Sequence, residues 1–118
     1  MKILRTLLLL SLVSLMLMRW GTKPDFDNRG EWLYTMTAMD GNTYDTGMIK
    51  FSGEATRGTY LEINIYEVEY AGEYTVDGVT IRLSGHENWE GTIENLNTIS
   101  GSWSHEDGVS GTFVATRK

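Results

Sequence analysis

From Gly30 onward, turn signals divide the chain into short runs that have the composition of β-strands. Asp-Gly pairs and Asn-containing pairs tolerate the positive φ angles that tight hairpins require. No stretch of useful length shows helical periodicity. The pattern predicts eight strands, at residues 31–39, 45–54, 58–66, 71–76, 79–84, 87–94, 97–104 and 109–117. Because every connection is short, consecutive strands are expected to be antiparallel neighbours.

The residues between these runs predict where the chain turns. The predicted turns are Asp40-Gly41-Asn42, Gly53 to Arg57, Ala71-Gly72, Asp77-Gly78, Gly85-His86, Asn95-Leu96-Asn97 and Asp107-Gly108. An eight-stranded meander removes both exposed edges when it closes on itself. The sequence therefore predicts an all-β fold, an eight-stranded antiparallel up-and-down barrel. Its interior is just wide enough for side chains or for one small ligand.

Three glycines, Gly91, Gly101 and Gly111, lie ten residues apart, and each precedes Thr or Ser and then a large apolar residue. A hairpin about Leu96 pairs Ile93 with Ile99, Gly91 with Gly101, and Trp89 with Trp103. A hairpin about Glu106 pairs Gly101 with Gly111, Trp103 with Val109, and Ile99 with Phe113. The glycines then form a row on the core face, where they let strands coil. A phosphate-binding loop is disfavoured because no helix follows any of the three.

Residues 1–20 have the composition of an export signal. Lys2 and Arg5 precede an apolar run from Thr6 to Met18. At about 1.5 Å per residue the run spans roughly 20 Å, less than a bilayer core of about 30 Å. This pattern indicates a secretory signal peptide, and the lack of an A-x-A-like cleavage site leaves an uncleaved signal-anchor over residues 3–20 as the alternative. The barrel of residues 30–118 is expected to be exported, to the periplasm, the cell surface or the medium, with 21–29 as a polar linker.

Charge and composition exclude several function classes. The chain has 10 Lys and Arg residues against 16 Asp and Glu residues, and all the acidic residues lie beyond Arg19. Without a basic patch that could follow a phosphate backbone, nucleic acid is excluded as a partner. The absence of cysteine excludes disulfides and thiolate chemistry. No serine occupies a G-x-S-x-G turn, so we expect a binding protein, not an enzyme, with no cofactor.

The two ends of the predicted barrel carry a further signal. The first strand opens with Gly30-Glu31-Trp32, a G-x-W, and Arg117 on the last strand has the parity of Phe113 and Ala115, which are predicted to face inward. In a closed meander these strands are neighbours, so Arg117 is expected to stack over Trp32. This combination resembles the calycin superfamily (lipocalins, fatty-acid-binding proteins, avidins). The chain is shorter than a typical lipocalin and resembles the small lipocalin-like domains of bacterial exported proteins.

A meander places the turns after the first, third, fifth and seventh strands together, at the end opposite Trp32 and Arg117. This end is expected to be the mouth, and it is acidic with two histidines. Its polar residues are Asp40, Asp45, Glu67, Glu69, His86, Glu87, His105, Glu106 and Asp107. Like charges repel anionic ligands such as fatty acids, so neutral or cationic ligands or a basic protein partner fit better. The His-Glu pairs have the ligand types of a divalent-metal site, but exposed turns are polar in any case, and we predict no metal site.

The inward positions nearest the mouth are the candidate ligand contacts. They are predicted to be Met36, Ile65, Leu83, Trp89 and Trp103. Aromatic and flexible apolar walls suit a small hydrophobic ligand. The alternative is that these large side chains simply fill a narrow barrel.

The run from Tyr60 to Tyr70 is predicted to have Leu61, Ile63 and Ile65 inside and its tyrosines outside. Tyr60, Tyr66 and Tyr70 would then form an outer surface suited to a protein partner. Two functions follow. The first is a lipocalin-like carrier that binds or sequesters a small apolar, neutral or cationic ligand in the barrel. The alternative is a protein-interaction module, an inhibitor or a subunit of a cell-envelope assembly, with a solid barrel.

Overall fold

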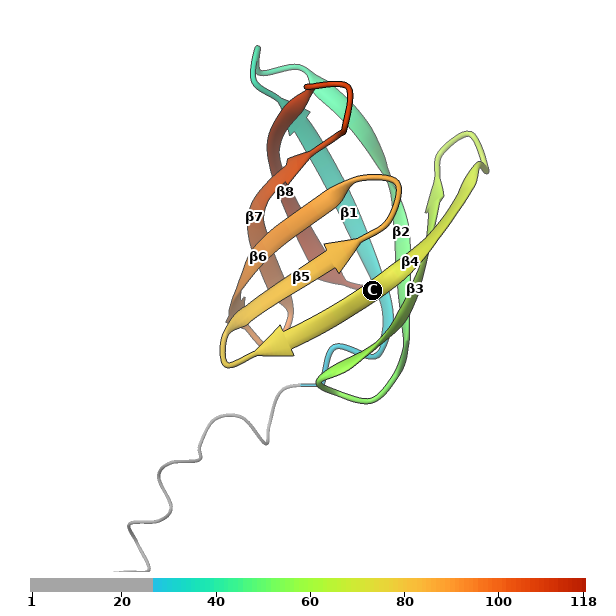
Figure 1. The fold of residues 1–118 in the computed structure, drawn as a ribbon, viewed down its shortest axis with the longest axis vertical. Coiled ribbons are helices and arrows are strands. Elements are labelled where there is room, and N and C mark those ends of the chain that lie inside the picture. Colours follow the sequence, from blue (N-terminus) through green and yellow to red (C-terminus); the bar gives the residue numbers. More distant parts are fainter. Residues whose placement is uncertain (1–26) are drawn as a thin grey trace, which may run out of the picture.

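The computed structural model describes residues 27–118, and these residues form one antiparallel sheet that closes into a barrel (Figure 1). The strands are β1 (Gly30–Ala38), β2 (Thr43–Gly53), β3 (Arg57–Asn64), β4 (Glu69–Asp77), β5 (Thr80–Ser84), β6 (Asn88–Asn95), β7 (Thr98–Ser104) and β8 (Ser110–Arg117). Each strand pairs with the next, and β8 pairs with β1. The predicted eight-stranded up-and-down barrel is confirmed. The predicted signal or anchor segment lies outside the described residues.

Along the strands, buried side chains alternate with exposed ones. On β1, Trp32, Tyr34 and Met36 are buried, whereas Leu33 between them is 48% exposed. The same alternation places Trp89 on β6, Ile99 and Trp103 on β7, and Phe113 on β8 inside the barrel. One face of each strand therefore builds a continuous aromatic and aliphatic core.

Most turns lie where the sequence predicts them, and Gly41, Gly78 and Gly108 have the expected positive φ angles. The exception is Ala71-Gly72, which lies within β4 and is not a turn. The chain turns earlier, between β3 and β4, without a glycine. Glu67 adopts the left-handed conformation at φ 64° there. Asn64 holds this turn, because its side-chain oxygen accepts hydrogen bonds from the backbone N–H groups of Tyr66 and Val68.

The register of β6 and β7 is as predicted, with Gly91 opposite Gly101 and Trp89 opposite Trp103. The register of β7 and β8 differs by two residues, because Gly101 lies opposite Phe113 and Trp103 opposite Gly111. The predicted Gly101–Gly111, Trp103–Val109 and Ile99–Phe113 pairs are wrong. The cause is the hairpin loop, in which His105 O accepts from Gly108 N and Gly108 follows with φ 98°. This left-handed residue lengthens the loop and moves its centre toward Asp107.

The face assignment of β3 is also wrong. Tyr60 and Glu62 are buried, with 2% and 0% of their surface exposed, and they point into the barrel. Leu61 and Ile63 lie on the outer side and are only half-buried. The β3–β4 turn leaves Ile65 60% exposed at its tip. Apolar character alone does not set this strand's orientation, because its inner position is taken by a carboxylate.

The end of the barrel opposite the mouth is closed by Arg117. Its guanidinium carbon lies 4.4 Å from the centre of the Trp32 ring, as the sequence predicts. The same group donates hydrogen bonds to the carbonyl oxygens of Asp27, Arg29 and Leu96. Residues 27–29, predicted as part of a linker, are thereby held against the barrel, and the carbonyl of Asn28 accepts from the Trp32 indole N–H at 2.7 Å.

Gly30, the glycine of the G-x-W, has a φ of 109° that L side chains rarely adopt.

Among residues 27–118, no helix is long and apolar enough to cross a membrane.

Candidate functional site at the mouth of the barrel

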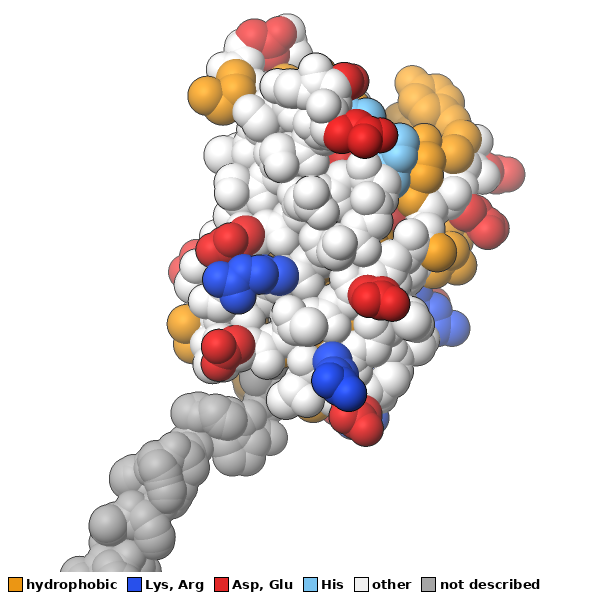
Figure 2. Space-filling view, in the orientation of Figure 1, with side chains coloured by type: hydrophobic (Ala, Val, Ile, Leu, Met, Phe, Trp, Pro, Cys, Tyr) orange, Lys and Arg blue, Asp and Glu red, His pale blue; other side chains and the backbone are white. Residues whose placement is uncertain are grey.

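The turns after β1, β3, β5 and β7 gather at one end of the barrel, as predicted (Figure 1). Two histidines meet there: the ring centres of His86 and His105 lie 4.7 Å apart. The ring of Tyr70 stacks on the other side of His86 at 4.0 Å. Figure 2 shows these histidines beside acidic side chains and the apolar tip of the β3–β4 hairpin. The predicted mouth residues of β5–β6 and β7–β8 are thus brought together.

The wall beside Tyr70 is the least regular part of the barrel. β4 pairs with β3 from Glu69 onward, but it pairs with β5 only from Glu73 onward. The first residues of β4 therefore have no strand partner on the β5 side, and in Figure 1 the β3–β4 hairpin leans away from β5 and β6. The Tyr70–His86 stack covers this edge, and these side chains can move without breaking backbone hydrogen bonds between β4 and β5.

Glu87, predicted on the exposed rim, is instead buried with 3% of its surface exposed. It has the parity of Trp89 on β6, so its side chain points into the barrel beneath the histidines. His86 Nε2 lies 3.6 Å from Glu87 Oε2. Burial raises the pKa of Glu87, and both histidines act in the opposite direction. Glu106 and Asp107 remain on the exposed rim, where Asp107 contacts His105 at 3.0 Å.

Glu62 lies deeper and is fully buried. The Tyr34 hydroxyl donates a hydrogen bond of 2.9 Å to Glu62 Oε2. Burial first, and then the nearby Glu87 and Asp45 carboxylates, raise the pKa of Glu62 to about 8. Sequence reasoning missed Glu62. Its only signal was a carboxylate inside an otherwise apolar strand run.

Three carboxylates therefore influence one another in the mouth-end interior, which we define by Tyr34, Asp45, Tyr60, Glu62, Glu87 and Trp89. Asp45 raises the pKa of both Glu62 and Glu87 by charge repulsion. The Lys and Arg side chains of residues 27–118 lie elsewhere. Lys50, Arg57 and Arg82 are exposed, and the opposite end holds Arg29, Arg117 and Lys118. Within this part of the chain, His86 and His105 are the basic side chains that lie near these acids.

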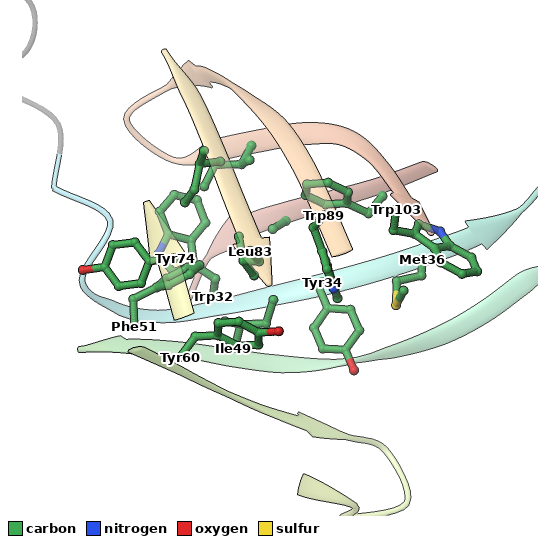
Figure 3. Close-up of a cluster of buried hydrophobic side chains, with 14 residues drawn as sticks. Trp32, Tyr34, Met36, Ile49, Phe51, Tyr60, Tyr74, Leu83, Trp89 and Trp103 are labelled. Atoms are coloured by element: carbon green, nitrogen blue, oxygen red, sulfur yellow. The ribbon is translucent and has the colours of Figure 1, made fainter. Parts of the chain in front are cut away.

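Aromatic rings pack together in the same region (Figure 3). The Trp89 ring contacts Tyr34 edge-on at 5.4 Å and Phe113 at 4.9 Å. Trp103 lies nearer the rim, where its indole N–H donates to the carbonyl oxygens of Thr112 and Thr37. Of the predicted ligand-lining residues, Met36, Leu83, Trp89 and Trp103 are buried as expected. Ile65 is the exception and lies outside the barrel.

Several buried polar atoms in this region have no hydrogen-bond partner among the described residues. They include Tyr60 Oη, Glu62 Oε1 and Glu87 Oε1. The Tyr60 ring fits against Gly72 and Gly85, and a Cβ at either position would overlap it. The predicted outer tyrosine surface is therefore wrong for Tyr60, and Tyr70 contributes to the mouth; Tyr66 is 77% exposed in the turn.

The His and Asp or Glu side chains at the mouth do not converge as metal ligands do. In residues 27–118, no group of three or more His, Asp or Glu side chains has an arrangement that could hold a metal ion. The site offers carboxyl and hydroxyl oxygens and aromatic faces. Such groups accept hydrogen bonds and attract positive charge.

The chain matches no protein-family model and no curated protein. Solved structures do resemble it, and those below are designed proteins. A redesigned β-barrel has 18% identity and a TM-score of 0.62 over 76% of this chain and 90% of its own. The redesigned barrel mFAP1, bound to DFHBI, has 18% identity and a TM-score of 0.60 over 75% and 94%. A de novo fluorescence-activating barrel has 17% identity and a TM-score of 0.56 over 76% and 93%. At this identity, the likeness establishes a shared barrel fold.

Proposed function

We propose that the chain is an exported, lipocalin-like binding protein that holds a small ligand in the mouth-end interior of its barrel. The observation that carries this proposal is the set of buried, unpartnered polar atoms among aromatic rings near the mouth end of the barrel. Burying polar groups without partners is unfavourable, and binding sites commonly combine apolar walls with a few such groups. Two of the similar designed barrels hold DFHBI, which agrees with a ligand site in this type of barrel.

The end closed by Arg117 supports the same proposal. The Arg117–Trp32 stack and the G-x-W glycine favour a relationship with the calycins, whose barrels open at the opposite end. Export rests on the N-terminal apolar run described above. In this proposal the protein binds or sequesters its ligand and does not transform it.

Fluorescence titration tests the proposed function. Trp89 and Trp103 lie at the site, so an occupant of the mouth-end interior should change their emission. The full chain is titrated with DFHBI and with the neutral dye Nile red while tryptophan and dye emission are recorded. Saturable changes for either probe are expected. If neither of these probes nor a small amphiphile changes tryptophan emission, ligand carriage is refuted.

A second candidate function, a protein-interaction module, is favoured by a different surface. The outer face of β8, β1, β2 and β3 carries a shallow groove of about 600 Å³. Its apolar members include Leu33, Met48, Ile63 and Val114, and Leu33 and Val114 are each 48% exposed. Contiguous exposed apolar side chains often mark protein contacts. Replacing Met48 and Ile63 by Ser should abolish partner binding without changing the titrations above if this is the functional surface.

A further inference from the structure

The orientation of β3 is the first sign of a charged ligand. The strand places Glu62 in the core and leaves Leu61 and Ile63 on the outer face, half-buried. The opposite orientation would bury two aliphatic side chains and expose the carboxyl. Departures from local folding rules of this kind are expected where function requires them.

Only one of the two carboxyl oxygens of Glu62 accepts a hydrogen bond from the described residues. Tyr34 donates to Oε2, whereas Glu62 Oε1 and Glu87 Oε1 have no partner with hydrogen-bond geometry among the described residues; the Trp89 indole N–H lies near Glu87 and lowers its pKa. Both side chains are at least 97% buried. A buried carboxyl without donors is costly, and the N–H groups of a bound molecule would satisfy these oxygens.

The charge of this region determines which donor fits. Glu62, Glu87, Asp45 and the Tyr34 hydroxyl influence one another electrostatically, and Tyr34 contacts Glu62 directly; of the two rim histidines, His86 lies 3.6 Å from Glu87. An anion would be repelled, and a neutral ligand would leave Glu62 protonated. A cation with several N–H groups satisfies both the charge and the unpartnered oxygens.

The aromatic walls distinguish an organic cation from a metal ion. Tyr34 and Trp89 place aromatic rings beside Glu62 and Glu87, and aromatic faces attract ammonium groups while accommodating their hydrocarbon parts. No set of described acidic and histidine side chains has an arrangement that could hold a metal ion. Entry beside Tyr70 requires movement of side chains only, because β4 and β5 are unpaired there.

We propose that the mouth-end interior binds a small organic ammonium ion whose N–H groups donate to the free oxygens of Glu62 and Glu87. This inference rests on the proposed function and adds the charge class of the ligand. Because burial keeps much of Glu62 protonated near neutral pH, ammonium binding releases a proton from Glu62. Affinity then rises with pH as that proton becomes easier to remove.

Calorimetry on the full chain tests the inference with three probes of one shape: phenethylammonium, phenethyl alcohol and hydrocinnamate, which are cationic, neutral and anionic. Phenethylammonium is expected to bind at least about tenfold more tightly than the alcohol, and hydrocinnamate most weakly. Runs in two buffers of different ionisation enthalpy should reveal the released proton. Equal affinity for the ammonium and the alcohol overturns the inference.

Matched variants test which carboxylates give the site its preference for the ammonium ion. Glu62→Gln and Glu87→Gln should each weaken phenethylammonium binding by about 30-fold or more and leave alcohol binding nearly unchanged. Glu90→Gln is the control, because Glu90 is on the outer face of β6, 61% exposed beside Arg82, and its loss changes the net charge equally. If Glu90→Gln weakens binding as much as the other two, general surface charge explains the preference and the site is refuted.

The outcomes also separate this inference from the proposed function. Binding of the neutral probe or of Nile red without preference for the ammonium refutes the cation site and leaves ligand carriage intact. If no probe binds at all, both are refuted. Should Glu62→Gln fail to fold, Glu87→Gln carries the same test from the turn that precedes β6.

Discussion

At the scale of single residues, Arg117 both stacks on Trp32 and donates hydrogen bonds to backbone carbonyls, and the sequence predicts only the first of these contacts. Its parity predicted the stack on Trp32, which is observed at 4.4 Å. Its hydrogen bonds to Asp27, Arg29 and Leu96 carbonyls could not be predicted, because they depend on how residues 27–29 return to the barrel. The planar guanidinium satisfies several carbonyls at once, which a lysine ammonium does less well.

Replacing Arg117 by Ala is expected to lower the free energy of unfolding by about 2–3 kcal/mol, because charged hydrogen bonds and a cation–π contact are lost together. Arg117→Lys should recover less than half of that loss. Urea unfolding followed by tryptophan fluorescence measures both. Lys118→Ala is the control, because its exposed ion pair with Glu31 should contribute less than about 1 kcal/mol. A loss for Arg117→Ala no larger than for Lys118→Ala would contradict the assignment.

Glu62 and Glu87 show where residue-level prediction fails. The predicted inward face of Leu61, Ile63 and Ile65 implied that Glu62 points outward, and the turn topology of a meander placed Glu87 on the rim. Both are buried. The information that reverses the assignment is long-range: Tyr34 on β1 supplies the hydroxyl that meets Glu62 on β3. No local pattern encodes such a pair.

At the scale of elements, the order of the strands was predictable and the registers only partly so. The β6–β7 pairing followed from the matched Trp89–Trp103 and Gly91–Gly101 pairs. The β7–β8 pairing did not, because Gly108 lengthens the loop. The inward face of β3 was predicted wrongly because the chain turns at Asn64–Val68, where Glu67 adopts a left-handed conformation that is more common for glycine. Turn geometry thus limited prediction more than strand composition did.

The inward glycines of β6 and β7 allow close strand approach. Replacing them by alanine should therefore destabilise the barrel, and by different amounts at the two positions. A Cβ on Gly101 would overlap the Glu90 carbonyl oxygen and lie 2.6 Å from Gly91 Cα, both backbone atoms. A Cβ on Gly91 would lie 2.8 Å from side-chain atoms of Ile99 and Phe113, which can shift. Gly91→Ala should cost about 1–3 kcal/mol and Gly101→Ala more than that.

Thermal unfolding of the two variants, with the outward Ser102→Ala as control, measures this order. Ser102→Ala should change stability by less than about 0.5 kcal/mol. If Gly101→Ala is as stable as the wild-type chain, the glycines do not mark close backbone approach, and their role in coiling the wall would have to be abandoned.

At the scale of the whole molecule, the barrel closes one end with Arg117 and buries acids near the other. This arrangement predicts an unusual dependence of stability on pH. Glu62 has a pKa of about 8 in the folded chain and about 4.5 as its ordinary value. Between these values the folded state binds a proton that the unfolded state lacks, so stability falls as pH rises, by about 1.4 kcal/mol per pH unit. Glu87 acts in the same direction.

Glu62→Gln removes the contribution of Glu62, so its stability should decline less steeply from pH 4.5 to 8 than that of the wild-type chain. The Asp27 carboxyl, with a pKa of about 2, titrates below this window and does not interfere. Urea midpoints across the range measure the difference. Parallel curves for the two chains would show that Glu62 is solvated.

The most direct test of a charged binding interior is the carboxyl resonance of Glu62, followed by ¹³C NMR and assigned by its loss in Glu62→Gln. In the free chain it should titrate near pH 8, because burial and the neighbouring acids disfavour its charge. Saturating phenethylammonium should lower that pKa, because the bound cation stabilises the carboxylate. A Glu62 that titrates near its ordinary value of 4.5, with no change when the ammonium is added, would contradict both the buried site and its ligand.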